Sequence, residues 1–166
     1  MNALVGRSLP DVDLAATDGS MVNPAKLAGL AVIFCYPRTG RPGHPDPPGW
    51  NDIPGAHGST PQALAYSKHY KNFLEFNIQV FGLSFQDAEW QREFASRCKL
   101  PFPLLSDHGR AFSNALGLQV FSTGGKDYLV RRTLIALDGI IEFDRTAWTN
   151  PADDAKASLE LFKPDR

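Results

Sequence analysis

Residues 30–36 read LAVIFCY, a short continuous apolar run that is bounded by Gly29 and Pro37. A run of this length, rich in β-branched and aromatic side chains, is typical of a strand that is buried on both faces of a sheet. We therefore expect a central strand here, with helices covering both of its faces.

Two later segments extend the same sheet. Residues 77–84 (NIQVFGLS) and 132–137 (RTLIAL) are also apolar and rich in β-branched or aromatic residues. Asp138 and Gly139 follow the second segment and predict a tight hairpin turn into residues 140–143, because this pair tolerates the positive φ angles of such turns.

Helical patterns alternate with these strands. In residues 61–76, apolar side chains recur on one helical face at Ala63, Tyr66, Tyr70 and Phe73. Further helices are expected over residues 87–99, 107–116 and 153–162, with Gly117 ending the second of these. This order predicts an α/β fold in which an N-terminal extension precedes a central mixed sheet flanked by helices.

Residues 37–58 form an unusual insert between the first strand and the first helix. Six prolines and five glycines rule out regular structure over most of this segment. Loops of this length in compact domains are usually functional or disordered, and the apolar Trp50 and Ile53 favour an ordered, packed loop.

Composition narrows the class of protein. The 166 residues, 43% of them hydrophobic, are enough for one substantial core, so we expect a single domain over residues 1–166 with the insert at 37–58. A net charge of -1 argues against nucleic acid partners and anionic membranes. No apolar run is long enough to span a bilayer, and residues 1–13 lack the pattern of a secretion signal, so a cytoplasmic location is expected.

The cysteines and histidines do not form a recognisable metal site. Cys35 lies in the apolar strand, where it is expected to be a structural residue, and Cys98 is expected to be an incidental helix residue. The four histidines lack the close spacing of metal ligands: His44, His57, His69 and His108. We therefore predict no metal and no organic cofactor.

The junction between the insert and the first helix reads GSTPQ, residues 58–62. Ser59 or Thr60 is expected at the N-cap, with Pro61 in the first turn, where its missing N–H costs nothing. A helix N-terminus stabilises an anion through its unpaired N–H groups. A serine hydrolase is an alternative, but His57 and Pro61 occupy the positions at which a nucleophile elbow requires glycine.

Five segments, in this order and spacing, resemble the peroxiredoxins of the alkyl hydroperoxide reductase/thiol-specific antioxidant class. The resemblance is greatest to the bacterioferritin comigratory protein (Q-type) branch. The segments are residues 6–14 with Asp18 and Gly19, 34–37, 58–62, 100–107 and 131–134. The resemblance implies a thioredoxin-like (redoxin) fold and a thiol peroxidase that reduces hydrogen peroxide or organic hydroperoxides. It also implies a thiol reductant such as a thioredoxin-like protein, and it allows a homodimer.

This resemblance places Ser59 at the position of the peroxidatic cysteine. It places Arg131 at the arginine that lowers the pKa of that thiol and orients the peroxide. Gly58, Thr60 and Pro37 complete the implied substrate site. Because neighbouring strand residues face opposite sides, only one of Arg131 and its neighbour Arg132 is expected to point inward or toward this site.

Two further positions depart from the family pattern. Ala56 stands where a threonine is usual, three residues before the nucleophile, and Leu64 stands where this branch often has a resolving cysteine.

Serine changes the chemistry that the resemblance implies. A cysteine thiol, with an unperturbed pKa of about 8.5, ionises beside an arginine and a helix N-terminus, whereas an alcohol is too weak an acid. We therefore predict no peroxide turnover at Ser59. The serine is either a deliberate replacement or a natural loss, and Ala56 and Leu64 favour the loss.

The main alternative is a non-catalytic binding or regulatory module that uses the same fold. An exposed apolar patch formed by the insert, Trp50 and Trp148 would favour it.

Overall fold

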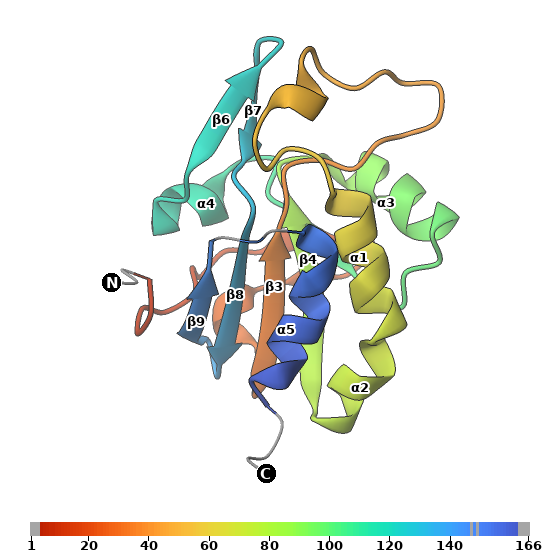
Figure 1. Cartoon of the computed structure of the whole chain (residues 1–166). Coiled ribbons are helices and arrows are strands. Elements are labelled where there is room, and N and C mark those ends of the chain that lie inside the picture. The colour runs from red at the N-terminus through yellow and green to blue at the C-terminus, as the bar shows by residue number, and fades with distance from the viewer. Residues whose placement is uncertain (1–3, 147, 149, 163–166) are drawn as a thin grey trace.

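A seven-stranded mixed sheet forms the centre of the computed structural model, which describes residues 4–146, 148 and 150–162 (Figure 1). In sheet order the strands are β2 (Met21–Val22), β1 (Leu14–Ala16), β5 (Leu104–Ser106), β4 (Ile78–Ser84), β3 (Leu30–Cys35), β8 (Arg132–Leu137) and β9 (Ile140–Arg145). The β3–β4 and β4–β5 pairs are parallel, and the other pairs are antiparallel. The predicted mixed sheet is confirmed.

Helices cover both faces of this sheet, as expected. They are α1 (Ser59–Lys68), α2 (Tyr70–Glu75), α3 (Ala88–Arg97), α4 (Ala111–Leu116) and α5 (Asp154–Glu160), with short 3₁₀ turns η1 (Pro24–Lys26), η2 (Trp50–Asp52) and η3 (Pro151–Asp153). Buried side chains of α1, α2, α3 and α5 share one core cluster, and those of α4 belong to the cluster on the opposite face. Figure 1 shows α1 and α5 side by side across the front of the sheet.

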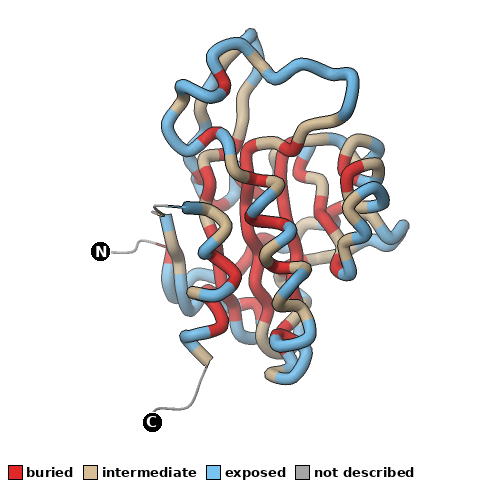
Figure 2. The backbone as a smooth tube through the Cα atoms, turned by 45° about the vertical axis from the view of Figure 1, so that its right-hand side comes forward, coloured by how far each residue is buried: buried red, intermediate tan, exposed pale blue. Residues whose placement is uncertain are grey.

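The central strand β3 supplies both core clusters. It lies between β4 and β8, and each of its side chains after Leu30 is buried. Val32 and Phe34 pack with α1 and α5, whereas Ile33 and Cys35 pack with α4 on the other face. This alternation follows from the two-residue period of a strand, and Figure 2 shows the buried positions gathered along the sheet.

Two helix predictions need correction. The single helix expected over 61–76 is two helices, because the backbone leaves the helical region at His69 (φ −96°, ψ 6°) and resumes in α2, which places Phe73 in the core. The helix expected from residue 107 begins at Ala111. Asp107 lies before it and accepts hydrogen bonds from the backbone N–H groups of Phe112 and Ser113.

The insert is ordered because it packs on a hairpin that the sequence analysis missed. This hairpin comprises β6 (Val120–Thr123) and β7 (Lys126–Leu129). The Trp50 ring lies 5.7 Å from Phe121 and 5.0 Å from Tyr128 between ring centroids, and Trp50 is buried. Trp50 therefore cannot belong to an exposed apolar patch. Figure 1 shows the insert and the hairpin together beyond the end of β3.

Among the described residues, no helix combines the length and the apolar character that a membrane crossing requires.

The predicted hairpin turn between β8 and β9 is present, with φ angles of 50° at Asp138 and 80° at Gly139. A Cβ atom at Gly139 would lie 2.6 Å from the Ala25 carbonyl oxygen, whereas one at Gly125, with φ 77°, would meet nothing within 4 Å. We expect Gly139→Ala to lower the free energy of unfolding by about 1–3 kcal/mol more than Gly125→Ala, because only the first adds a clash with backbone. Urea denaturation of both variants measures the difference, and equal losses would contradict the close approach.

Candidate functional site

The carboxyl end of β3, the start of β8 and the start of α1 lie at one edge of the sheet. Cys35, the last residue of β3, pairs with Arg132 at the start of the antiparallel β8. Arg131, which precedes β8, therefore lies at this same edge of the sheet. The insert leaves from the end of β3 and returns to begin α1 at Ser59.

Gly58 shapes the start of α1. It is the N-cap, with φ 106°, and its side-chain position faces the Pro151 ring, because a Cβ atom there would lie 2.9 Å from Cγ of that proline. Ser59 and Thr60 are the first helical residues, so the expectation that one of them is the N-cap is wrong. Pro61 lies in the first turn, as expected.

The Ser59 hydroxyl contacts a buried guanidinium. Nη2 of Arg131 donates to Oγ of Ser59 at 3.2 Å, and the two residues are 4% and 3% exposed, respectively. The same nitrogen also lies 3.1–3.3 Å from the carbonyl oxygens of Gly55, Ala56 and His57. Because Nη2 carries two hydrogens, these four acceptors share them.

The other side of the guanidinium leads into a buried hydrogen-bond network. Nη1 of Arg131 donates to Oε1 of Gln62 at 2.5 Å, and Nε2 of Gln62 donates to Oδ2 of Asp154 at 3.0 Å. Asp154 is fully buried and accepts three further hydrogen bonds at 2.6–2.7 Å. These come from the side chains of Tyr66, Thr133 and Arg145. The network therefore joins α1, α5, β8 and β9 behind Ser59.

Burial also sets the ionisation of this region. Burial lowers the pKa of Arg131 to about 10, an effect that Asp154 opposes, so the guanidinium is charged at neutral pH. Burial and the Asp154 carboxylate raise the pKa of Tyr66, so its phenol stays protonated and donates. Burial raises the pKa of Cys35, a fully buried thiol, as expected for a structural cysteine.

The sequence analysis did not identify Asp154 or Arg145 as part of this region. In the sequence, Asp154 is one of several polar residues of the last predicted helix. In the structure it is buried, and so are its neighbours Ala155, Ser158 and Leu159. A carboxylate among such residues is a signal that could have been used, because a buried charge requires partners.

Two of the predicted site residues, Arg131 and Pro37, line two different cavities. A cavity of about 290 Å³ borders Arg131, His57 and Trp148, whereas Pro37 lines a larger cavity of about 680 Å³ between the insert, the β6–β7 hairpin and α3. Neither cavity is lined by Ser59, Gly58 or Thr60.

Other candidate groups lie apart from this region. Arg132 pairs with Asp144, so of the two adjacent arginines only Arg131 points toward Ser59. Cys98, half-buried, follows the last residue of α3. Within the described part of the chain, no group of three His, Cys, Asp or Glu side chains could hold a metal ion.

Comparison with known proteins gives a consistent family. The Redoxin family model matches residues 4–157. The chain is 29% identical over 163 residues to peroxiredoxin Q, chloroplastic, from Oryza sativa subsp. japonica, covering 95% of this chain and 66% of the relative. It is 30% identical over 163 residues to peroxiredoxin Q, chloroplastic, from Sedum lineare, covering 95% and 77%. The chain thus spans about two thirds of the length of the rice relative.

Solved structures agree on the fold. Peroxidoxin BcpB from Mycobacterium tuberculosis superimposes with a TM-score of 0.75 at 21% identity, covering 98% of this chain and 100% of that chain. A cysteine-to-serine mutant of PrxQ from Xylella fastidiosa gives 0.75 at 17% identity, covering 95% and 93%. The fold is therefore the thioredoxin-like fold that the sequence predicted.

The Asp154 network generates a stability prediction. We expect Asp154→Asn to lower the free energy of unfolding by about 3–5 kcal/mol, because it removes the buried negative charge that faces Arg145 and balances Arg131. The exposed neighbour Asp153 provides the control, and Asp153→Asn should change the value by less than about 0.5 kcal/mol. Chemical denaturation measures both variants. Similar values for the two would show that the network contributes little.

Proposed function

Because the chain belongs to the redoxin family, as a peroxiredoxin of the Q type, we propose that it retains a peroxidase site in which serine replaces the reacting sulfur. Peroxiredoxins act on hydroperoxides with thiol reductants. The proposed site therefore derives from one that reduces hydrogen peroxide or organic hydroperoxides, and its reductant would be a thioredoxin-like protein.

The observation that carries this proposal is the 3.2 Å contact between Nη2 of Arg131 and Oγ of Ser59 in the first turn of α1. A sulfur at this position would lie beside a buried cation and a helix N-terminus, and both stabilise a thiolate. In the family reaction, the thiolate attacks one peroxide oxygen, the O–O bond breaks, and the products are a sulfenic acid and water or an alcohol. The Ser59 hydroxyl is too weak an acid to begin this reaction, and its oxygen cannot form the sulfenic product.

Two further residues support a natural loss of the reaction. Ala56 lacks a hydroxyl group and contributes only its carbonyl oxygen to Arg131. Leu64, 44% exposed on α1, has no thiol that could condense with a sulfenic acid at residue 59 to form a disulfide. We infer that the peroxidatic serine is part of a site that lost several of its catalytic groups.

The same proposal assigns the other site residues. Gly58 sets the start of α1, Thr60 stands next to Ser59, and Pro37 belongs to the larger cavity. We propose one redoxin domain over residues 1–166, with the insert at 37–58. A homodimer and a cytoplasmic location remain predictions, and the Oryza and Sedum relatives are named chloroplastic.

A non-catalytic binding or regulatory module is the second candidate. It is favoured by the 3% exposure of Ser59 and by the three insert carbonyl oxygens that compete for Nη2 of Arg131. In such a site the backbone of the insert occupies the hydrogen-bonding positions around Arg131. This arrangement is stable in a protein that does not react with peroxide.

Restoring the sulfur tests the proposal. We expect Ser59→Cys to consume hydrogen peroxide or cumene hydroperoxide, with excess dithiothreitol, at least about 100-fold faster than the unchanged protein. Adding Arg131→Ala should remove most of this gain, because the cation stabilises the thiolate and the developing negative charge. The matched control is Ser67→Cys, which places a thiol on the same helix away from Arg131 and should stay near the basal rate.

Circular dichroism and denaturation first establish that each variant is folded. If Ser59→Cys is folded but no faster than Ser67→Cys, the peroxidase site is refuted and the binding module is the better description. If Ser59→Cys gains activity that Arg131→Ala does not reduce, the proposed role of Arg131 is wrong.

A further inference from the structure

The larger cavity, of about 680 Å³, is bounded by the insert, the β6–β7 hairpin and α3. The insert is held on two sides of it. On the hairpin side, Oγ1 of Thr123 donates to the Pro48 carbonyl oxygen at 2.7 Å. On the α3 side, Nε1 of Trp90 donates to the Thr39 carbonyl oxygen at 2.8 Å. These contacts fix the walls, and the enclosed volume lies within the range of small-molecule sites.

The hairpin side of this cavity carries a cation that the chain does not pair. Both lining arginines have carboxylate partners. Arg110 pairs with Asp127 at 2.8 Å, and Arg38 pairs with Asp46 at 2.8 Å. Lys126, in β7, is exposed and forms no ion pair with a described residue. An unpaired ammonium group at a cavity wall favours an anionic ligand.

Two further donors belong to the same wall as Lys126. Tyr128 is two residues away in β7, and its hydroxyl forms no hydrogen bond with a described residue. Burial raises the pKa of Tyr128, an effect that Arg38 opposes, so the phenol is protonated and can donate. Nη1 of Arg110 contacts Asp127, whereas Nη2 has no acceptor among the described residues, and this side chain is 39% exposed. Several accessible donors at one wall suit a group with several oxygen acceptors, as in a phosphate.

The walls on the side of the insert and α3 are of a different kind. They include Pro45, Pro47, Phe85 and Trp90. The carboxylate on this side, Asp87, accepts from the backbone N–H of Trp90, so its charge faces the positive N-terminus of α3. Proline and aromatic rings present flat apolar surfaces, and a planar ring buries its own faces against them. Inorganic phosphate would leave these walls without a complementary group.

We propose that this cavity binds a phosphate monoester that carries a planar aromatic ring, of the kind found in a purine mononucleotide. The phosphate oxygens accept from Lys126, Tyr128 and Nη2 of Arg110, and the ring lies against Trp90 and the prolines of the insert. Ser59 does not line this cavity, so the proposal is independent of any reaction at residue 59.

Isothermal titration calorimetry of the full chain tests the two parts of this ligand separately. The probes are adenosine monophosphate, adenosine, ribose phosphate and sodium phosphate, all at matched ionic strength. We expect saturable binding of adenosine monophosphate with a dissociation constant of about 0.1–1 mM, and binding of the other three at least about tenfold weaker, because each lacks the ring or the phosphate. The proposal fails if adenosine monophosphate does not bind, or if adenosine, ribose phosphate or inorganic phosphate binds equally well.

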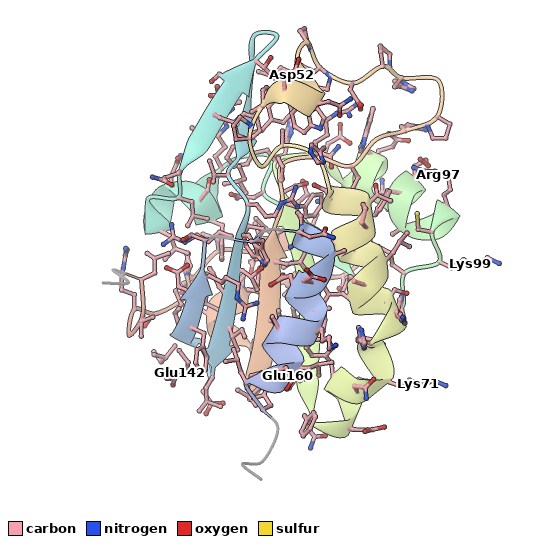
Figure 3. The ribbon with its side chains drawn as sticks, viewed as in Figure 1. Asp52, Lys71, Arg97, Lys99, Glu142 and Glu160 are labelled. Atoms are coloured by element: carbon pink, nitrogen blue, oxygen red, sulfur yellow. The ribbon has the colours of Figure 1, made fainter. Side chains whose placement is uncertain are left out.

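Paired variants, each first shown by circular dichroism to be folded, locate the site. Lys126→Gln and Tyr128→Phe should each weaken the binding of adenosine monophosphate by about tenfold, because each loses a donor to the phosphate. Tyr128→Phe keeps the ring that contacts Trp50. The matched controls Lys71→Gln, on α2 away from the hairpin (Figure 3), and Tyr70→Phe should bind normally. Binding that the cavity variants leave unchanged, or that the controls weaken equally, would overturn the proposal.

Discussion

The structure around the insert depends on how one buried cation, Arg131, is satisfied. Its Nη2 atom contacts Ser59 and three backbone carbonyl oxygens of the insert, and its Nη1 atom contacts Gln62. Desolvating a guanidinium is costly, so the surrounding groups must supply acceptors and a compensating negative charge. Asp154 supplies that charge through Gln62, which couples the C-terminal helix to the start of α1. The end of the insert, α1, β8 and α5 are thereby held in one arrangement.

The same interaction explains why a neutral side chain at residue 59 is compatible with the fold. A thiolate would add a negative charge beside Arg131, and that charge would help to satisfy the guanidinium. Ser59 offers only a neutral oxygen, so more of the acceptor role falls to the carbonyl oxygens of Gly55, Ala56 and His57. Backbone carbonyls belong to every residue type, so this contact to Arg131 does not require a hydroxyl side chain at residue 56. The replacement of the usual threonine by Ala56 is consistent with this arrangement.

The sequence predicted the parts of the structure that local patterns determine. The continuous apolar run of β3 and the Asp138-Gly139 turn were recognised because strand burial and positive φ angles leave direct signals. The break at His69 was missed because neither proline nor glycine marks it, and it depends on placing Phe73 in the core. Ser59 and Arg131 were brought together by the family resemblance. Asp154 could not be assigned to them because its partners lie on α1, β8 and β9, as far as 92 residues away in sequence.

The insert holds these features together at the end of the sheet. Trp50 packs on Phe121 and Tyr128, and Oγ1 of Thr123 donates to the Pro48 carbonyl oxygen at 2.7 Å, so the insert is fixed to the β6–β7 hairpin. Figure 3 labels Asp52 at the end of η2, within the insert. Because the insert is fixed to this hairpin, the carbonyl groups of residues 55–57 stay against Arg131 and orient its guanidinium. Because Nη1 and Nη2 are both bound by the chain itself, the protein holds the guanidinium in one orientation beside Ser59.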